Sequence, residues 1–141
     1  MLIVVAGLPG SGKSTMADDL GRALNCAVLG VDQAEAAMWR AGVSPSAPTH
    51  HAAYLVVGSL AAEMGAELKF IVVECGDDRV YRDRVEHRTR NIEGFPEPTW
   101  EGVLRRRADF PPWTDERLTV DSVNSREANL QAALEYLSAA Q

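Results

Sequence analysis

Short apolar runs alternate along the chain with longer segments whose apolar residues recur at helical spacing. The runs predict strands at Leu2–Ala6, Ala27–Val31, Leu68–Cys75 and Leu118–Asp121. The helical spacing predicts helices at Thr15–Leu24, Gln33–Ala41, Ala52–Met64, Asp78–Arg90, Trp100–Ala108 and Glu127–Ala140. Strands that alternate with helices are typical of an α/β fold with a parallel sheet.

The glycine-rich stretch Gly7–Thr15 lies between the first predicted strand and the first predicted helix, which is the setting of a phosphate-binding P-loop. Glycines let successive backbone N–H groups turn toward one concavity, and the N-terminus of the helix adds a positive dipole end. A plain flexible turn would explain the glycines but not the lysine and two hydroxyls that follow. The residues expected to surround a bound polyphosphate are Gly10, Ser11, Gly12, Lys13, Ser14 and Thr15.

Three side chains of this stretch have separate expected roles. Lys13 is placed to reach the β- and γ-phosphate oxygens, and the hydroxyl of Ser14 to bind Mg²⁺. Thr15 is expected to contact an inner phosphate. The stretch therefore predicts a site for a nucleoside triphosphate.

Asp32 follows the second predicted strand and is the leading candidate for a general base. Ligands of open α/β sheets bind at the carboxyl ends of the strands, so we expect this carboxylate near the P-loop, where it can accept a hydroxyl proton. The alternative is that Asp32 caps the next helix. Trp39 either lines an acceptor pocket or packs in the core. A metal site at His50 and His51 is not expected, since adjacent side chains point apart.

Length and composition predict one globular domain, with 141 residues of which 46% are hydrophobic and 24% charged. No apolar stretch approaches the roughly 20 residues of a membrane span, and no signal peptide is expected, so we expect a cytoplasmic protein. Cys26 and Cys75 are expected to be reduced core residues.

The net charge of −6 argues against non-specific coating of nucleic acid, which needs a basic face. The arginines are nevertheless clustered, at positions Arg79, Arg82, Arg84, Arg88 and Arg90 and again at Arg105, Arg106 and Arg107. Such clusters suit phosphate contacts, but they also suit salt-bridged helix faces. We expect both uses, on different faces.

The P-loop, Asp32, the pair Arg84-x-x-x-Arg88 and the strand Leu118–Asp121 before a last helix together resemble P-loop kinases of the nucleoside-monophosphate-kinase-like group. Within that group the chain is most similar to small predicted ATP-binding kinases related to polynucleotide kinase domains, zeta-type toxins and antibiotic phosphotransferases. The resemblance implies a three-layer parallel sheet with strand order 2-3-1-4-5.

The resemblance also implies roles for residues in the second half of the chain. Arg84 would stack on the adenine, and Asn124 in the turn Val123-Asn124-Ser125 would border it. Arg88 would contact the transferring phosphate at the base of a lid at about residues 89–100, with the triple arginine as a further phosphate contact. Lids of this kind exclude water from the reaction.

One strand and one helix of that family, about 25 to 30 residues, are missing between Ala52–Met64 and Leu68–Cys75. Three explanations are open: a sequence incomplete near Met64-Gly65, which we favour, a deletion with the second strand re-paired against the first, or completion by a partner chain. The missing strand would lie between the second strand and the P-loop strand.

The sequence therefore predicts an ATP- and Mg²⁺-dependent kinase that phosphorylates a hydroxyl of a small molecule, with Lys13, Asp32 and Arg88 as catalytic residues. The alternatives are a 5′-hydroxyl polynucleotide kinase, which the acidic balance disfavours, and a nucleotide-binding module without phosphotransfer. The identity of the acceptor and the oligomeric state are not predicted.

Overall fold

The computed structural model describes residues 1–47, 49–89, 92, 96–109, 114 and 116–139 of the chain. The strands are β1 (Leu2–Ala6), β2 (Leu68–Glu74) and β3 (Leu118–Asp121). The helices are α1 (Lys13–Leu24), α2 (Val31–Arg40), α3 (Thr49–Glu63), α4 (Asp78–Glu86), α5 (Trp100–Ala108) and α6 (Arg126–Ser138).

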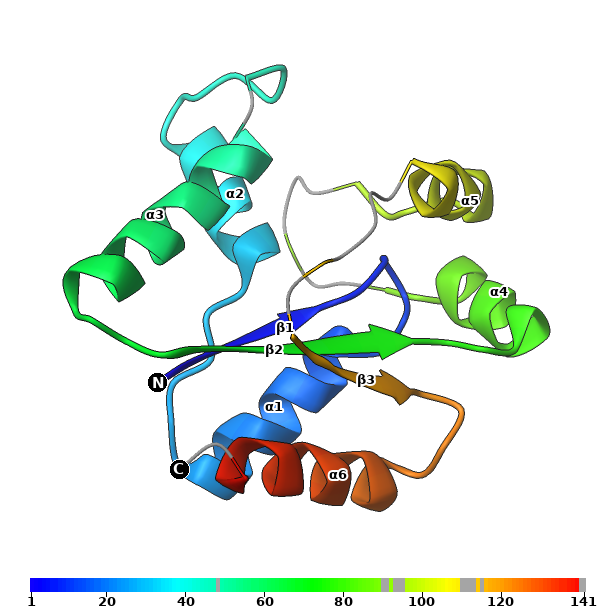
Figure 1. Cartoon of the computed structure of the whole chain (residues 1–141). Coiled ribbons are helices and arrows are strands. Elements are labelled where there is room, and N and C mark those ends of the chain that lie inside the picture. The colour runs from blue at the N-terminus through cyan, green and yellow to red at the C-terminus, as the bar shows by residue number, and fades with distance from the viewer. Residues whose placement is uncertain (48, 90–91, 93–95, 110–113, 115, 140–141) are drawn as a thin grey trace.

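The three strands form a parallel sheet in the order β1-β2-β3. Val4 of β1 is in register with Phe70 of β2, and Ile71 of β2 with Leu118 of β3. Because all three strands run in the same direction, their carboxyl ends lie at one edge, from which the P-loop leads into α1 (Figure 1). The α/β class and the parallel sheet are confirmed.

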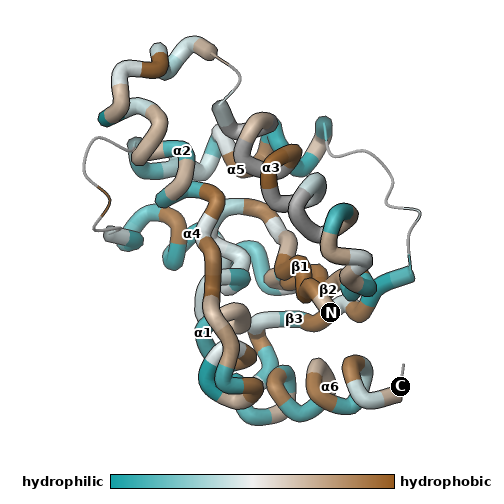
Figure 2. Tube along the Cα trace, turned by 90° about the vertical axis from the view of Figure 1, so that its left-hand side faces the viewer, coloured by the Kyte–Doolittle hydropathy of each residue, from teal (hydrophilic) through white to brown (hydrophobic). Residues whose placement is uncertain are grey.

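Helices α1 and α6 cover one face of this sheet (Figure 1). Met16 and Leu20 from α1 and Ala133 and Leu137 from α6 pack there against Ile71 and other buried residues of the strands. Figure 2 shows the hydrophobic strands between these two helices and the group α2, α3 and α5 on the opposite side. The core thus holds the P-loop strand and the first helix in a fixed relation.

A second, smaller cluster lies at the carboxyl edge of the sheet. It contains Cys75, Tyr81, Val85 and Val103, with Leu8 of the P-loop packed against it. Because Tyr81 and Val85 come from α4 and Val103 from α5, this cluster connects both helices to the phosphate loop.

The predicted second strand is wrong. Residues 27–30 have no regular structure, and Val31 is already the first residue of α2. Val28 and Leu29 are exposed, and Val28 lies over Gly21 of α1, where a Cβ would come within 2.5 Å of its Cγ2. Among the described residues no further strand lies beside this segment and none of its residues pairs with β1, so the segment has no ladder to join.

The other elements differ from expectation mainly at their ends. Helix α3 begins at Thr49 instead of Ala52, and α4 ends at Glu86 instead of Arg90. Cys75 is buried as expected, but Cys26 is exposed because the strand predicted beside it does not form; both are free thiols. Residues 110–113 and 140 lie outside the described part of the chain.

Candidate functional site

The P-loop presents unused backbone donors at the start of α1. Ser11 N–H donates to Leu8 O at 3.1 Å, and Met16 N–H donates to Gly12 O at 3.1 Å. Within the described residues, no backbone hydrogen bond uses the N–H groups of Gly10, Gly12, Ser14 or Thr15. The first N–H groups of a helix have no intrahelical partner, so this end of α1 offers several donors and a positive dipole to an anion.

Two glycines of the loop are required by its conformation and by its neighbours. Gly12 caps α1 in the left-handed region, at φ 105°. A Cβ on Gly7 would lie 2.4 Å from the carbonyl oxygen of Val73, so the loop passes directly over β2. Ser11 is buried beneath this loop, and its Oγ has no hydrogen-bond partner among the described residues. The glycines therefore fix the shape of the cradle.

Lys13 is the first residue of α1 and is half-buried, whereas Ser14 and Thr15 are exposed at the same end. The hydroxyl of Ser14 is thus available to a ligand at the mouth of the loop. The described residues contain no group of three or more His, Cys, Asp or Glu side chains arranged to hold a metal ion. Mg²⁺ keeps several waters and takes few protein ligands at phosphate sites, so one serine hydroxyl fits its requirements.

Arg84 lies beside the turn that follows β3. Its Nη1 donates to Ser122 Oγ at 2.8 Å and its Nη2 to Ser122 O at 3.1 Å. Ser122 in turn approaches the P-loop, because a Cβ on Gly12 would lie 3.1 Å from Ser122 Cβ. The structure therefore brings Arg84, the P-loop and the turn with Asn124 together, whereas Ser122 was not among the residues predicted for the site.

The turn after β3 is fixed by Asp121. Its Oδ1 accepts from Val123 N–H at 2.9 Å and from Gly76 N–H at 3.1 Å, and these two bonds hold the pKa of the carboxyl below its ordinary value. Asn124 is exposed, and its N–H donates to Asp121 O at 3.1 Å. This turn is therefore rigidly attached to the end of the sheet.

Asp32 lies in the first turn of α2 and is half-buried. It does not end a strand, and it is not the helix cap either, because Gly30 occupies that position. Both structural settings predicted for Asp32 are therefore wrong. Residues 27–30 lead directly into α2, so Asp32 lies at the N-terminus of this helix.

Two consecutive side-chain hydrogen bonds connect α2 to α3. Thr49 donates to Glu35 Oε1 at 2.7 Å, and Trp39 Nε1 donates to Thr49 Oγ1 at 3.0 Å. Trp39 is half-buried and lies in this helix–helix contact, which favours its packing role over the acceptor pocket. The side chains of His50 and His51 lie outside the described part of the chain.

Arg88 lies beyond the end of α4 at Glu86, whereas the sequence predicted a helix over Asp78–Arg90 that contained both Arg84 and Arg88. It is half-buried and lines a cavity of about 690 Å³ between the end of α4 and the start of α5. Of the predicted lid, residues 90–91 and 93–95 lie outside the described residues. Thr99 caps α5 by accepting from Gly102 N–H at 3.1 Å.

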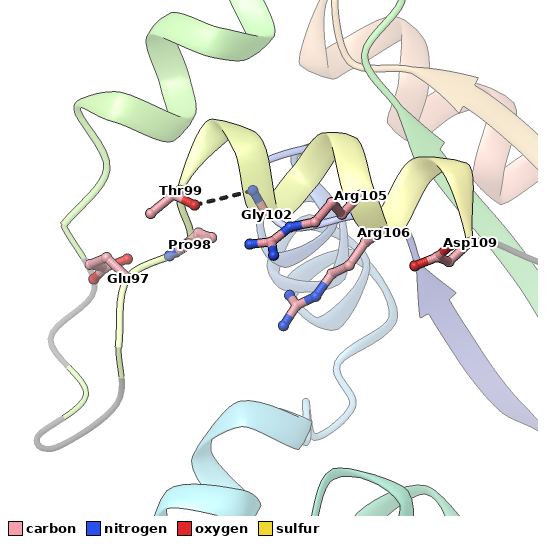
Figure 3. Close-up of a pocket in the computed structure, with 7 residues that line it drawn as sticks. All are labelled: Glu97, Pro98, Thr99, Gly102, Arg105, Arg106 and Asp109. Carbon is pink, nitrogen blue, oxygen red and sulfur yellow. Dashed lines mark hydrogen bonds between the residues drawn. The ribbon is translucent and has the colours of Figure 1, made fainter.

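The two arginine clusters are used differently. Arg82 pairs with Glu86 one turn along α4, at 2.7 Å, as expected for a salt-bridged helix face. Arg107 pairs with Asp78 at 2.9 Å and lies over the ring of Tyr81. Arg105 and Arg106 line a cavity of about 420 Å³ along α5 (Figure 3).

Tyr81 was not predicted as part of the site. It is 1% exposed, and its hydroxyl donates to the carbonyl oxygen of Pro9 in the P-loop at 2.9 Å. It packs in the cluster at the carboxyl edge of the sheet, and its contact with Pro9 depends on the approach of two segments far apart in the sequence.

Comparison with known proteins places this fold among P-loop proteins. Residues 2–61 match the family described as AAA domain. A sugar kinase from a Janibacter species, in an unliganded crystal structure, superposes with a TM-score of 0.68 over 96% of this chain and 93% of that chain, at 15% identity. No curated protein matches the sequence. The chain thus has a P-loop kinase-like fold with a shortened sheet. Among the described residues no helix is long and apolar enough to cross a membrane.

Proposed function

We propose that this protein is a cytoplasmic kinase that transfers the γ-phosphoryl group of ATP to a hydroxyl of a small-molecule acceptor. The observation that carries the proposal is the cradle of unused backbone N–H groups at the N-terminus of α1, with Lys13 as the first helical residue. The likeness to a protein described as a sugar kinase supports an acceptor that bears hydroxyl groups.

The residues of the loop bind and orient the triphosphate. The backbone donors surround the phosphates, Thr15 contacts an inner phosphate, and Lys13 and Arg88 balance the charge that develops on the γ-phosphoryl oxygens. The hydroxyl of Ser14 would hold Mg²⁺, which would supply further positive charge to stabilise the phosphates. The acceptor oxygen forms a bond to the γ-phosphorus while the bond to the bridging oxygen of ADP breaks.

Asp32 accepts the proton that leaves the acceptor hydroxyl. Its carboxylate lies in the first turn of α2, and a carboxylate is a proton acceptor suited to this step. Arg84 and the turn with Asn124 form the adenine site, which the hydrogen bonds between Arg84 and Ser122 support. Residues 1–141 form one domain with a lid at about residues 89–100.

The test is release of ADP in the presence of a panel of polyols, sugars, sugar acids and sugar phosphates. We expect Lys13→Met to weaken ATP binding, and Asp32→Asn to lower turnover about 10²- to 10⁴-fold while ATP affinity stays within about threefold. Asp18→Asn, a neutralisation at an exposed position of α1, is the matched control and should leave both unchanged. Near-normal turnover in Asp32→Asn would refute the base assignment.

A second candidate is a nucleotide-binding module without phosphotransfer. The observation that favours it is the position of Asp32 at the start of a helix instead of at the end of a strand in the sheet. ATP binding that depends on Lys13 but is accompanied by no turnover with any acceptor would select this candidate. A 5′-hydroxyl oligonucleotide in the same panel tests the polynucleotide kinase alternative.

A further inference from the structure

Helix α5 carries a cavity that the proposed roles of the P-loop do not use. It has a volume of about 420 Å³ and is lined by Glu97, Pro98, Thr99, Gly102, Arg105, Arg106 and Asp109. The members on α5 recur at intervals of three and four residues and therefore share one face of the helix. Figure 3 shows the side chains of Arg105 and Arg106 extending from the same side of α5.

These two arginines differ from Arg107, their neighbour. Arg107 pairs with Asp78 and lies over the rings of Tyr81 and Trp100. Among the described residues, Arg105 and Arg106 form no salt bridge or side-chain hydrogen bond, although Glu97 and Asp109 line the same cavity. Two guanidinium groups with their donors unused are suited to an anion, because each can form two parallel hydrogen bonds to a carboxylate or a phosphate.

A glycine lies between the arginines and the helix cap. A glycine inside a helix is less favourable than an alanine at the same position. Among the described residues, a Cβ on Gly102 would approach only the Oγ1 of Thr99, at 3.2 Å. Gly102 lines the cavity and, without a side chain, fills none of it.

The cavity also lies on the side of the molecule where an acceptor would bind. Val103 of α5 packs in the cluster that contains Leu8 of the P-loop, so α5 is attached next to the phosphate cradle. Helices α2 and α5 lie on the same face of the sheet (Figure 1), and in Figure 3 the guanidinium group of Arg106 extends from α5 toward the side on which α2 lies. Helix α2 carries Asp32, the proposed base.

We infer that Arg105 and Arg106 bind an anionic group of the acceptor, so that the substrate is a hydroxylated carboxylate or phosphate and not a neutral polyol. This inference rests on the proposed function, since it assigns the acceptor of the same reaction. Basic residues in the last turn of α5 also complement the helix dipole. That effect would change the stability of the protein but not its preference among ligands.

The test uses the intact protein and isothermal titration calorimetry. The anionic probes are gluconate and glucose 6-phosphate, and their neutral counterparts are sorbitol and glucose. The double variant Arg105→Gln/Arg106→Gln removes both charges, and Arg79→Gln on α4, also an exposed arginine, is the matched control. ADP is titrated into each variant, because the nucleotide is the other possible source of the bound anion.

We expect at least one anionic probe to bind about tenfold or more tightly than its neutral counterpart. The double variant should lose this preference while its affinity for ADP stays within about twofold, and Arg79→Gln should retain both. The inference would be overturned if no anionic probe bound, or if the neutral probes bound equally well. It would also be overturned if the double variant kept the preference, or if it lost affinity for ADP instead. A further outcome is an anion that binds through these arginines without ever being phosphorylated. That result would contradict the proposed function but would still support an anion site at Arg105 and Arg106.

Discussion

The hydroxyl of Tyr81 donates to the carbonyl oxygen of Pro9 at 2.9 Å, which joins α4 to the phosphate loop. The same ring packs edge-on against Trp100 of α5, with centroids 5.5 Å apart. Burial raises the pKa of Tyr81 to about 12, so the hydroxyl remains a donor across the physiological range. One side chain therefore connects the loop to both helices that carry the candidate arginines.

Removal of this hydroxyl should destabilise the protein modestly. Tyr81→Phe deletes one hydrogen bond and keeps the packed ring, so we expect the free energy of unfolding to fall by about 1 kcal/mol. Unfolding in urea measures this change. Tyr136→Phe is the control, because the Tyr136 hydroxyl makes no hydrogen bond to the described residues, and it should change the free energy of unfolding by less. Equal effects in both variants would show that the bond to Pro9 contributes nothing.

A methyl group on Gly7 should be far more damaging. A Cβ there would lie 2.4 Å from Val73 O, and the backbone φ of 149° disfavours a side chain as well. We expect Gly7→Ala to lower the free energy of unfolding by about 2–4 kcal/mol or to prevent folding, since backbone atoms of β2 would have to shift. Soluble yield and thermal unfolding report this effect.

Gly58→Ala is the matched control for that substitution. A Cβ at position 58 of α3 has no neighbour within 4 Å, and an alanine inside a helix is favoured over glycine by about 1 kcal/mol. We therefore expect a small rise in thermal stability. A loss of stability in Gly58→Ala would show that Gly58 has a packing role that the structure does not reveal.

Most local structure was predictable because it depends on short-range chemistry. The P-loop, the start of α5 after its Thr99 cap, and the strands β2 and β3 follow from glycines, capping residues and apolar runs that act within a few positions. The end of α4 was misplaced because His87 closes that helix without a glycine or proline to mark the stop. Arg88 therefore lies in the segment that follows α4 and not in the helix where it was predicted.

The second strand could not be predicted correctly from its own residues. Ala27–Val31 has the composition of a strand, but a strand needs a neighbour with which to exchange hydrogen bonds, and within the described residues the sheet consists of β1, β2 and β3. Because the predicted strand does not form, Asp32 lies at a helix start and Cys26 is exposed. Local sequence patterns do not predict contacts between distant segments, such as those of Tyr81 with Pro9 and of Arg84 with Ser122.

The two cysteines should react at different rates. Cys26 is exposed, whereas Cys75 is 5% exposed within the cluster under the P-loop. Because thiol reagents need access to the sulfur, we expect Cys26 alone to react quickly with a disulfide reagent in the native protein and both to react after unfolding in guanidinium. Absorbance of the released thiolate measures this, and Cys26→Ser should abolish the fast phase. Fast reaction of Cys75 would mean that this cluster opens readily.

The ion pair between α1 and α6 should make stability depend on pH. Arg126 donates to Asp19 at 2.6 Å and 3.1 Å and thereby holds the pKa of that carboxyl below its ordinary value. A depressed pKa in the folded state contributes stability above the unfolded pKa of about 3.9, and this contribution is lost as the pH falls through the folded value. Asp19→Asn should therefore destabilise the protein at about pH 7 and matter less at about pH 3. Urea unfolding at both pH values measures the difference, with the exposed Asp18→Asn as control; a penalty for Asp19→Asn that stays constant between them would exclude this linkage.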